Sequence, residues 1–188
     1  MALTSPSDSN WNVPNGLSAA RFVLAIAVCV LVEWRMLLAA VICFVIAAST
    51  DWIDGWWARK FQQVTKLGRI LDPFVDKIII CGALIALCAV PGSPIAPWMA
   101  TLVVGRELLV TSLRGMVEGQ GGDFSAKQLG KWKMVAQCVA IVSTMIELQY
   151  TNAPSWIHVT SVLSIWTAIV LTVISGLEYV LLVIKKPQ

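Results

Sequence analysis

Six long apolar runs constrain this chain more than any other feature of its sequence. Each is near the ~20 residues that a helix needs to cross a bilayer. Apolar residues make up 57% of the chain, above the ~45–50% that is usual in soluble domains, and the mean hydropathy is +0.76. Because they form continuous blocks and do not alternate, they predict an all-α integral membrane protein with six transmembrane helices, not a β-barrel. The expected segments are roughly Leu17–Val32, Met36–Trp57, Pro73–Val90, Ile95–Gly115, Trp132–Leu148 and Trp156–Ile184.

The remaining residues form short connections, so we expect a single domain over residues 1–188. Residues Met1–Gly16 are polar and are expected to be a loop-like interfacial segment before the first helix. The last apolar segment is long, and Gly176 marks a point where it could tilt or break. The five cysteines lie inside apolar blocks without ligand spacing, so we expect free thiols. His158, at a predicted helix start, is expected to have an interfacial role.

The basic residues predict the orientation of the helices. Of the 14 lysines and arginines, all but Arg35 fall on one side of the predicted bundle. Cytoplasmic loops carry such an excess of positive charge. We therefore expect a multi-pass protein of the bacterial cytoplasmic (inner) membrane, with both termini and the connection between the second and third segments on the cytoplasmic side. The net charge of +3 is modest and indicates contact with anionic lipid headgroups, not with nucleic acid.

Four aspartates flank the connection between the second and third segments. Asp51 and Asp54 are spaced i,i+3, and Asp72 and Asp76 are spaced i,i+4, so each pair shares one helix face. An ionised carboxylate near the hydrocarbon costs on the order of 2.5–3.5 kcal/mol, and clustered carboxylates raise one another's pKa. Two divalent cations would remove both costs, and oxygen-only ligands favour Mg²⁺ or Mn²⁺. The pattern predicts a site that holds two such ions against a phosphate ester.

Taken singly, each aspartate also has a purely structural explanation. Asp72 could cap a helix whose first residue is Pro73, and the first pair of aspartates could form ion pairs with Arg59 and Lys60 at a solvated helix end. The small residues between the aspartates favour a bound ligand, because they let it lie close to the backbone. Arg59 is then a candidate for the phosphate of that ligand. The small residues are Gly55, Ala58 and Gly68.

The stretch from Asp51 to Asp76 resembles the signature of the CDP-alcohol phosphotransferase family, D-x2-D-G-x2-A-R-x8-G-x3-D-x3-D. All eight fixed positions match: Asp51, Asp54, Gly55, Ala58, Arg59, Gly68, Asp72 and Asp76. Members of this family pass a group from a CDP-linked lipid or alcohol to a hydroxyl and release CMP. The resemblance extends over almost the whole chain and implies six transmembrane helices and a homodimer.

The resemblance also implies a role for each matched residue. The first three aspartates would bind metal, and Asp76 would complete the metal site and act as the general base. The cytidine diphosphate moiety would lie in a pocket lined by Gly55, Ala58, Arg59 and Gly68.

Two further stretches resemble bacterial phosphatidylglycerophosphate synthases of this family, namely residues 13–21 and residues 105–114 followed by 130–137. An anionic acceptor such as sn-glycerol 3-phosphate needs cations for its phosphate. The candidates are Arg106, Arg114, Lys131 and Lys133.

The two lysines are spaced i,i+2, so they cannot both point the same way along a helix, and one is expected only to anchor the interface. Arg106 and Glu107 could instead form an internal pair. Weaker candidates for the nucleotide or the acceptor are Asn15, Ser18 and Arg21.

These features predict a phospholipid-biosynthetic enzyme that transfers the phosphatidyl group of CDP-diacylglycerol to sn-glycerol 3-phosphate. Inositol phosphate, serine or phosphatidylglycerol, as in cardiolipin synthase, are alternative acceptors within the family. A cation transporter is an alternative from another class, because intramembrane aspartates also occur there. A transporter would place its carboxylates near the bilayer midplane, whereas these are expected at one end of the helices.

Overall fold

The computed structural model describes residues 13–61, 66–119, 128–150 and 153–185. Side chains are described within these ranges except at residues 13–15, 51–61, 66–72, 118–119, 128 and 185. The described chain is helical, with no strand in those ranges. Its helices are α1 (Val13–Glu33), α2 (Leu37–Phe61), α3 (Lys66–Cys88), α4 (Pro97–Gly119), α5 (Gln128–Gln149) and α6 (Ser155–Lys185).

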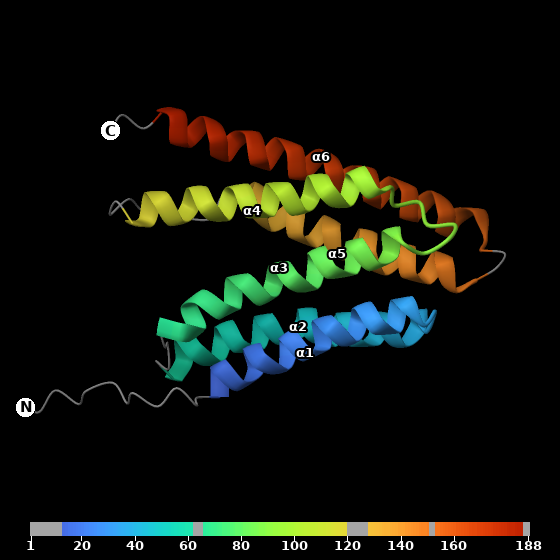
Figure 1. The fold of residues 1–188 in the computed structure, drawn as a ribbon, viewed down its shortest axis with the longest axis horizontal. Helices are drawn as coiled ribbons and strands as arrows, with labels where there is room; N and C mark the ends of the chain where they lie inside the picture. Colours follow the sequence, from blue (N-terminus) through green and yellow to red (C-terminus); the bar gives the residue numbers. More distant parts are fainter. Residues whose placement is uncertain (1–12, 62–65, 120–127, 151–152, 186–188) are drawn as a thin grey trace, which may run out of the picture.

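The six helices run alternately up and down in one elongated bundle (Figure 1). Helix α1 starts and α6 ends at the same end of the bundle, where α2 is also connected to α3 and α4 to α5 (Figure 1). The other three connections lie at the opposite end. This arrangement gathers at one end the helix termini that carry Arg59, Lys60, Lys66 and Lys131.

The predicted number and order of helices are confirmed for the described residues, but several boundaries differ. Helix α1 already begins at Val13, so the prediction of a loop through Gly16 is wrong for the last four residues of that segment. Helix α3 begins at Lys66, which places Pro73 inside the helix and excludes a helix N-cap at Asp72. Helix α6 runs without interruption through Gly176, so the break considered there is absent.

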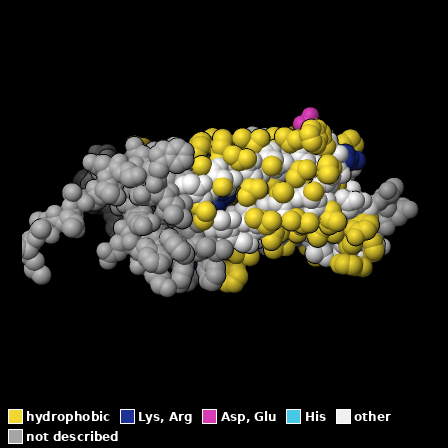
Figure 2. Space-filling view, turned by 90° about the horizontal axis from the view of Figure 1, so that it is seen from below, with side chains coloured by type: hydrophobic (Ala, Val, Ile, Leu, Met, Phe, Trp, Pro, Cys, Tyr) yellow, Lys and Arg dark blue, Asp and Glu magenta, His cyan; other side chains and the backbone are white. Residues whose placement is uncertain are grey.

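Among the residues that the structure describes, two helices are long and apolar enough to cross a membrane. Residues Gly16–Glu33 of α1 have a hydropathy of 2.0, and residues Ser155–Ile184 of α6 have a hydropathy of 2.2. The apolar part of α2, Leu37–Thr50, is shorter. Hydrophobic side chains also cover the outer surface over much of the face seen in Figure 2. An apolar surface of this extent in water would be unfavourable, and together with the two helices it indicates a membrane protein.

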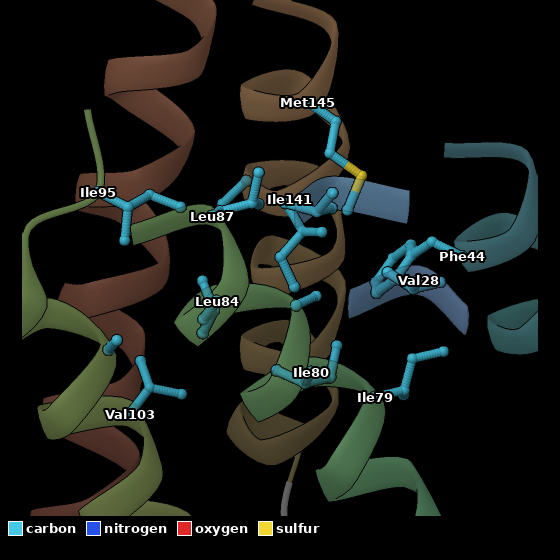
Figure 3. Packing of buried hydrophobic residues seen from close by; sticks show 14 of the residues in the cluster. Val28, Phe44, Ile79, Ile80, Leu84, Leu87, Ile95, Val103, Ile141 and Met145 are labelled. Carbon is cyan, nitrogen blue, oxygen red and sulfur yellow. The ribbon is translucent and has the colours of Figure 1, made fainter. Parts of the chain in front are cut away.

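The interior is a continuous cluster of aliphatic side chains (Figure 3). Val28 of α1, Phe44 of α2, Leu87 of α3 and Ile141 of α5 are each no more than 1% exposed. Helix α3 packs against α1, α2, α4 and α5 and is therefore central to the described bundle. Most sides of α3 thus face a neighbouring helix, whereas Phe74 and Ile85 are exposed.

The pairing of α5 with α6 includes polar contacts as well as apolar ones. Gln137 donates a hydrogen bond to Thr172 Oγ1 at 3.1 Å, and the hydroxyls of Thr144 and Ser161 lie 3.2 Å apart. Such contacts hold helices together where lipid offers no hydrogen-bonding alternative.

Other predicted features are also found at the surface and in the core. The cysteines are free thiols, at intermediate burial. His158 Nδ1 lies 2.5 Å from Glu147 Oε1, where α5 is followed by α6. The interfacial role of this histidine stays a prediction.

Candidate active site

The four aspartates of the signature lie on two helices that pack together. Asp51 and Asp54 belong to α2, and Asp72 and Asp76 belong to α3. The two helices follow one another at the end of the bundle where α1 begins and α6 ends (Figure 1). Only the side chain of Asp76 is described. The convergence of the other three carboxylates stays a prediction, as do the roles of Gly55, Ala58, Arg59 and Gly68, whose local environment lies outside the described side chains.

Asp76 is held by a cation from another helix. Arg21 of α1 donates a hydrogen bond from its terminal nitrogen to Asp76 Oδ1 at 2.9 Å. The arginine side chain is 1% exposed and the aspartate side chain is 26% exposed. The carboxylate thus has a fixed partner on its buried side while part of it stays accessible. Arg21, a candidate for the nucleotide or the acceptor, therefore contacts the expected general base.

A second charged group lies where α4 meets α5. Glu107 accepts a hydrogen bond from Arg106 at 3.3 Å and a very short one from Lys133 of α5. The three side chains are each about one-tenth exposed or less. We refer to Arg106, Glu107 and Lys133 as the Glu107 cluster. The internal pair of Arg106 and Glu107 that the sequence suggested is confirmed. Lys133, 26 positions after Glu107, is a second partner of the same carboxylate.

The two lysines at the start of α5 point in different directions, as their spacing predicts. Lys133 is buried against Glu107, whereas Lys131 is exposed. The sequence left open which of them faces the interior, and the structure identifies Lys133.

Arg114 lies two turns after Arg106 on α4 and has fewer protein contacts. Its terminal nitrogen is 3.5 Å from the hydroxyl of Tyr179 on α6, at the limit of a hydrogen bond. Its Nε is buried and has no hydrogen-bond partner among the described residues. A buried guanidinium nitrogen without a partner is costly, so this position is suited to an anionic ligand.

Lys77 connects the two charged groups. It follows Asp76 on α3 and lies beside the Glu107 cluster. Lys77 and Glu107 both line a groove of about 310 Å³ between α3 and α4. The other lining residues are mostly apolar: Pro73, Phe74, Ile78, Cys81, Val104, Leu108 and Thr111. The charged groups therefore border a groove that suits an apolar chain.

A second apolar groove lies on the other side of the bundle. It has a volume of about 420 Å³ and lies between α2 and α5, where Phe44, Ala48 and Ser49 face Cys138 and Val142. Ser49 is two residues before Asp51, so this groove leads to the aspartate-bearing part of α2.

The chemistry of the donor set fits divalent cations. The signature contributes four carboxylates and no sulfur or imidazole, which is the ligand preference of Mg²⁺ and Mn²⁺. Among the described side chains alone, no group of three or more acidic, histidine or cysteine residues gathers. The other three aspartates of the signature lie outside the described side chains, so the metal site stays a prediction.

Sequence reasoning missed three contributors to these groups. Lys77 directly follows the last aspartate of the signature, and this position could have indicated that it lies near the site. Ser175 and Tyr179, on α6, lie more than 60 positions from the arginines that they contact. No local pattern connects residues at such a separation.

Comparison with known proteins shows similarity over nearly the whole chain. Residues 11–174 match the model of a family described as CDP-alcohol phosphatidyltransferase. A CDP-diacylglycerol–glycerol-3-phosphate 3-phosphatidyltransferase of Bacillus subtilis (strain 168) is 34% identical over 90% of this chain and 93% of its own length. A protein with the same name from Blochmanniella floridana is 31% identical, with 90% of each chain covered.

The similarity extends over a smaller share of the chain to a protein with a different name. A cardiolipin synthase (CMP-forming) of Oryza sativa subsp. japonica is 30% identical over 68% of this chain and 45% of its own length.

The contrast between the two lysines gives a test of the Glu107 cluster. We expect Lys133→Ala to lower the free energy of unfolding by about 2 kcal/mol, because it removes a partner from a buried carboxylate. Lys131→Ala, a matched change two residues earlier at an exposed position, should alter it by less than about 0.5 kcal/mol. Thermal and denaturant unfolding of the two variants in the same detergent measures this difference. Equal effects would show that Glu107 does not depend on Lys133.

Proposed function

The chain belongs to the CDP-alcohol phosphatidyltransferase family, and we propose that it transfers the phosphatidyl group of CDP-diacylglycerol to sn-glycerol 3-phosphate. The products are phosphatidylglycerol phosphate and CMP, and the process served is phospholipid biosynthesis. The observation that carries the choice of acceptor is the Glu107 cluster together with Arg114, which lies two turns further along α4 and contacts Tyr179.

The charge of this group suits a phosphate monoester. With every group ionised, the four side chains carry a net charge of +2, and a phosphate monoester carries about −1.5 to −2 at neutral pH. Serine, which has no phosphate, would leave this positive charge unmatched. The relatives named for transfer to glycerol 3-phosphate agree with this assignment over nine-tenths of the chain.

Within the group, Arg114 is the residue that contacts the acceptor phosphate directly. The Nε atoms of Arg106 and Arg114 are both buried without a partner among the described residues. The terminal nitrogens of Arg106 are bound to Glu107 and Ser175, whereas those of Arg114 have a single long contact with Tyr179. Arg106 and Lys133 are already bound to Glu107, and they contribute positive potential at short range.

The donor lipid fits the apolar grooves beside the aspartates. The acyl chains of CDP-diacylglycerol lie in the bilayer and against the groove between α2 and α5, which ends two residues before Asp51. In this proposal all six helices cross the bacterial cytoplasmic (inner) membrane, and both termini and the active site lie on the cytoplasmic side. The excess of basic residues at that end supports this orientation.

The nucleotide part of the donor lies along the small residues of the signature. Gly55, Ala58 and Gly68 leave room for the cytidine diphosphate moiety, and Arg59 binds its phosphate. Asp51, Asp54, Asp72 and Asp76 hold two Mg²⁺ or Mn²⁺ ions. When bound, the ions offset the charge of the pyrophosphate and of the clustered carboxylates.

Asp76 is the general base. It removes the proton from the primary hydroxyl of glycerol 3-phosphate, and the resulting oxygen forms a bond to the lipid-side phosphorus while the bond to CMP breaks. Arg21 donates a hydrogen bond to Asp76 Oδ1 at 2.9 Å from the buried side, and this contact fixes the orientation of the carboxylate. Arg114 holds the acceptor phosphate and so limits where the hydroxyl can lie.

Two aspects of the proposal rest on the family alone. The first is that the protein is a homodimer. The second is the alternative acceptor, phosphatidylglycerol, which we consider because one relative is named cardiolipin synthase. A phosphodiester carries one negative charge, which matches the four side chains less well than a phosphate monoester. A cation transporter fits poorly, because the described Asp76 is bound to a buried arginine.

Release of CMP by the purified protein tests the acceptor. With CDP-diacylglycerol and Mg²⁺ or Mn²⁺, we expect release with glycerol 3-phosphate to exceed that with serine, inositol phosphate or phosphatidylglycerol by about 100-fold or more. Chelation of the divalent ions should stop the reaction, and re-addition should restore it. Turnover with another acceptor but not with glycerol 3-phosphate would contradict the proposed acceptor.

Asp76→Asn tests the general base. The amide cannot accept the proton, so we expect CMP release to fall by about 100-fold or more, while binding of CDP to the purified protein persists. Glu33→Gln, the same chemical change at an exposed site on α1, serves as the control and should leave turnover unchanged. Normal turnover in Asp76→Asn would exclude this residue as the base.

A further inference from the structure

Helix α6 contributes a surface to the acceptor region that the signature does not contain. Ser175, Gly176 and Tyr179 lie on α6 at i, i+1 and i+4, and all three approach side chains from α4, which packs beside α6 (Figure 1). Ser175 and Tyr179 are at most 3% exposed. These residues face the two arginines that the acceptor phosphate requires.

Ser175 and Gly176 determine the path of the Arg106 side chain. Arg106 donates a hydrogen bond to Ser175 Oγ at 2.9 Å. A Cβ atom at Gly176 would lie only 3.1 Å from Arg106 Cγ and 3.8 Å from its Nε. The arginine therefore runs across the α6 backbone at a distance that only glycine leaves free. This close approach gives a reason for a glycine at position 176, where α6 continues without a break.

Tyr179 contacts both arginines with one side chain. The guanidinium carbon of Arg106 lies 5.6 Å from the centre of the tyrosine ring, within the range of a cation–π interaction. The hydroxyl of the same ring is 3.5 Å from the terminal nitrogen of Arg114. The ring and its hydroxyl thus link the two arginines, which lie two turns apart on α4.

The differing engagement of the two arginines indicates what Tyr179 does. Arg106 is held on three sides, by Glu107, Ser175 and the tyrosine ring. Arg114 has one long contact, made by its terminal nitrogen. The Nε atoms of both arginines are buried without a partner among the described residues, so the contrast lies in the terminal nitrogens. A rigid Arg106 thus fixes the ring, and the ring in turn limits where the Arg114 guanidinium can lie.

We propose that Tyr179 is a positioning residue that aligns Arg106 and Arg114 for the phosphate of the acceptor and so sets acceptor affinity. This inference rests on the proposed function, because it assigns the two arginines to an acceptor phosphate. Tyr179 does not itself touch the reacting atoms. Its effect therefore appears in the KM for the acceptor and not in kcat.

Kinetics of two tyrosine variants test the proposal. Tyr179→Leu removes the ring, and we expect it to raise the KM for glycerol 3-phosphate about tenfold, with kcat and the KM for CDP-diacylglycerol within about twofold of wild type. Tyr179→Phe keeps the ring and removes the hydroxyl, and with it the long contact with Arg114. It should restore most of the affinity, within about threefold of wild type.

A purely structural role for Tyr179 predicts a different result. Ile165→Ala is a control on the same helix, since Ile165 is 4% exposed and lies in the apolar cluster. It should lower the Tm without changing the ratio of the two KM values. If Tyr179→Leu behaves like this control, or raises both KM values equally, the positioning role is wrong.

Gly176→Ala provides a second test if Tyr179→Leu does not fold. The new methyl group would displace the Arg106 side chain by a few tenths of an ångström, so the KM for glycerol 3-phosphate should rise selectively. Gly115→Ala, on α4 where an added Cβ meets nothing within 4 Å, is the matched control and should have no effect. An unchanged KM in Gly176→Ala would contradict the proposal.

Failure of the proposed function is recognised separately. If the wild-type protein releases CMP only with an acceptor other than glycerol 3-phosphate, the assigned acceptor is wrong. The same variants are then measured with the acceptor that works. A selective rise in its KM supports the positioning role if that acceptor carries a phosphate, and an unchanged KM contradicts it.

Discussion

The burial of Glu107 between Arg106 and Lys133 is the interaction on which the acceptor region depends. A single charge in an apolar bundle would cost several kcal/mol, and removal of one partner would leave the others uncompensated. The three side chains therefore constrain one another and bring α4 and α5 into a fixed relation. Arg106 extends this constraint to α6 through Ser175 and Tyr179. The surplus positive charge that remains is available to a ligand, and we assign it to the acceptor phosphate.

Helix α3 relates this region to the signature. Asp76 faces α1, where Arg21 binds it, and Lys77 faces the groove shared with α4. Neighbouring residues on a helix point about 100° apart. A single turn of α3 therefore places Asp76 against Arg21 and Lys77 in the groove that Glu107 also lines. In the proposed reaction, this places the general base on the same turn as a cation that borders the acceptor region. The central position of α3 in the bundle makes that geometry possible.

Much of the fold and part of the site could be predicted from the sequence. Apolar runs and basic loops are local patterns, and they gave six helices in the right order, with both termini at one end. The starts of α1 and α3 were missed because polar residues continue these helices past the apolar runs, and Pro73 lies inside α3 without ending it. The spacing of Lys131 and Lys133 predicted that only one is buried, but choosing between them needed Glu107. The contacts of Tyr179 depend on how α4 packs against α6, which no local pattern encodes.

The kinetics of Arg114→Ala test the central claim most directly, namely that this group of charges binds the acceptor phosphate. The proposal predicts a rise in the KM for glycerol 3-phosphate of about tenfold or more, because a charge-assisted contact is lost. The KM for CDP-diacylglycerol should stay within about twofold, and Lys131→Ala should change neither value. If the KM for the lipid rises instead, or if neither KM changes, the acceptor phosphate binds elsewhere and the account is wrong.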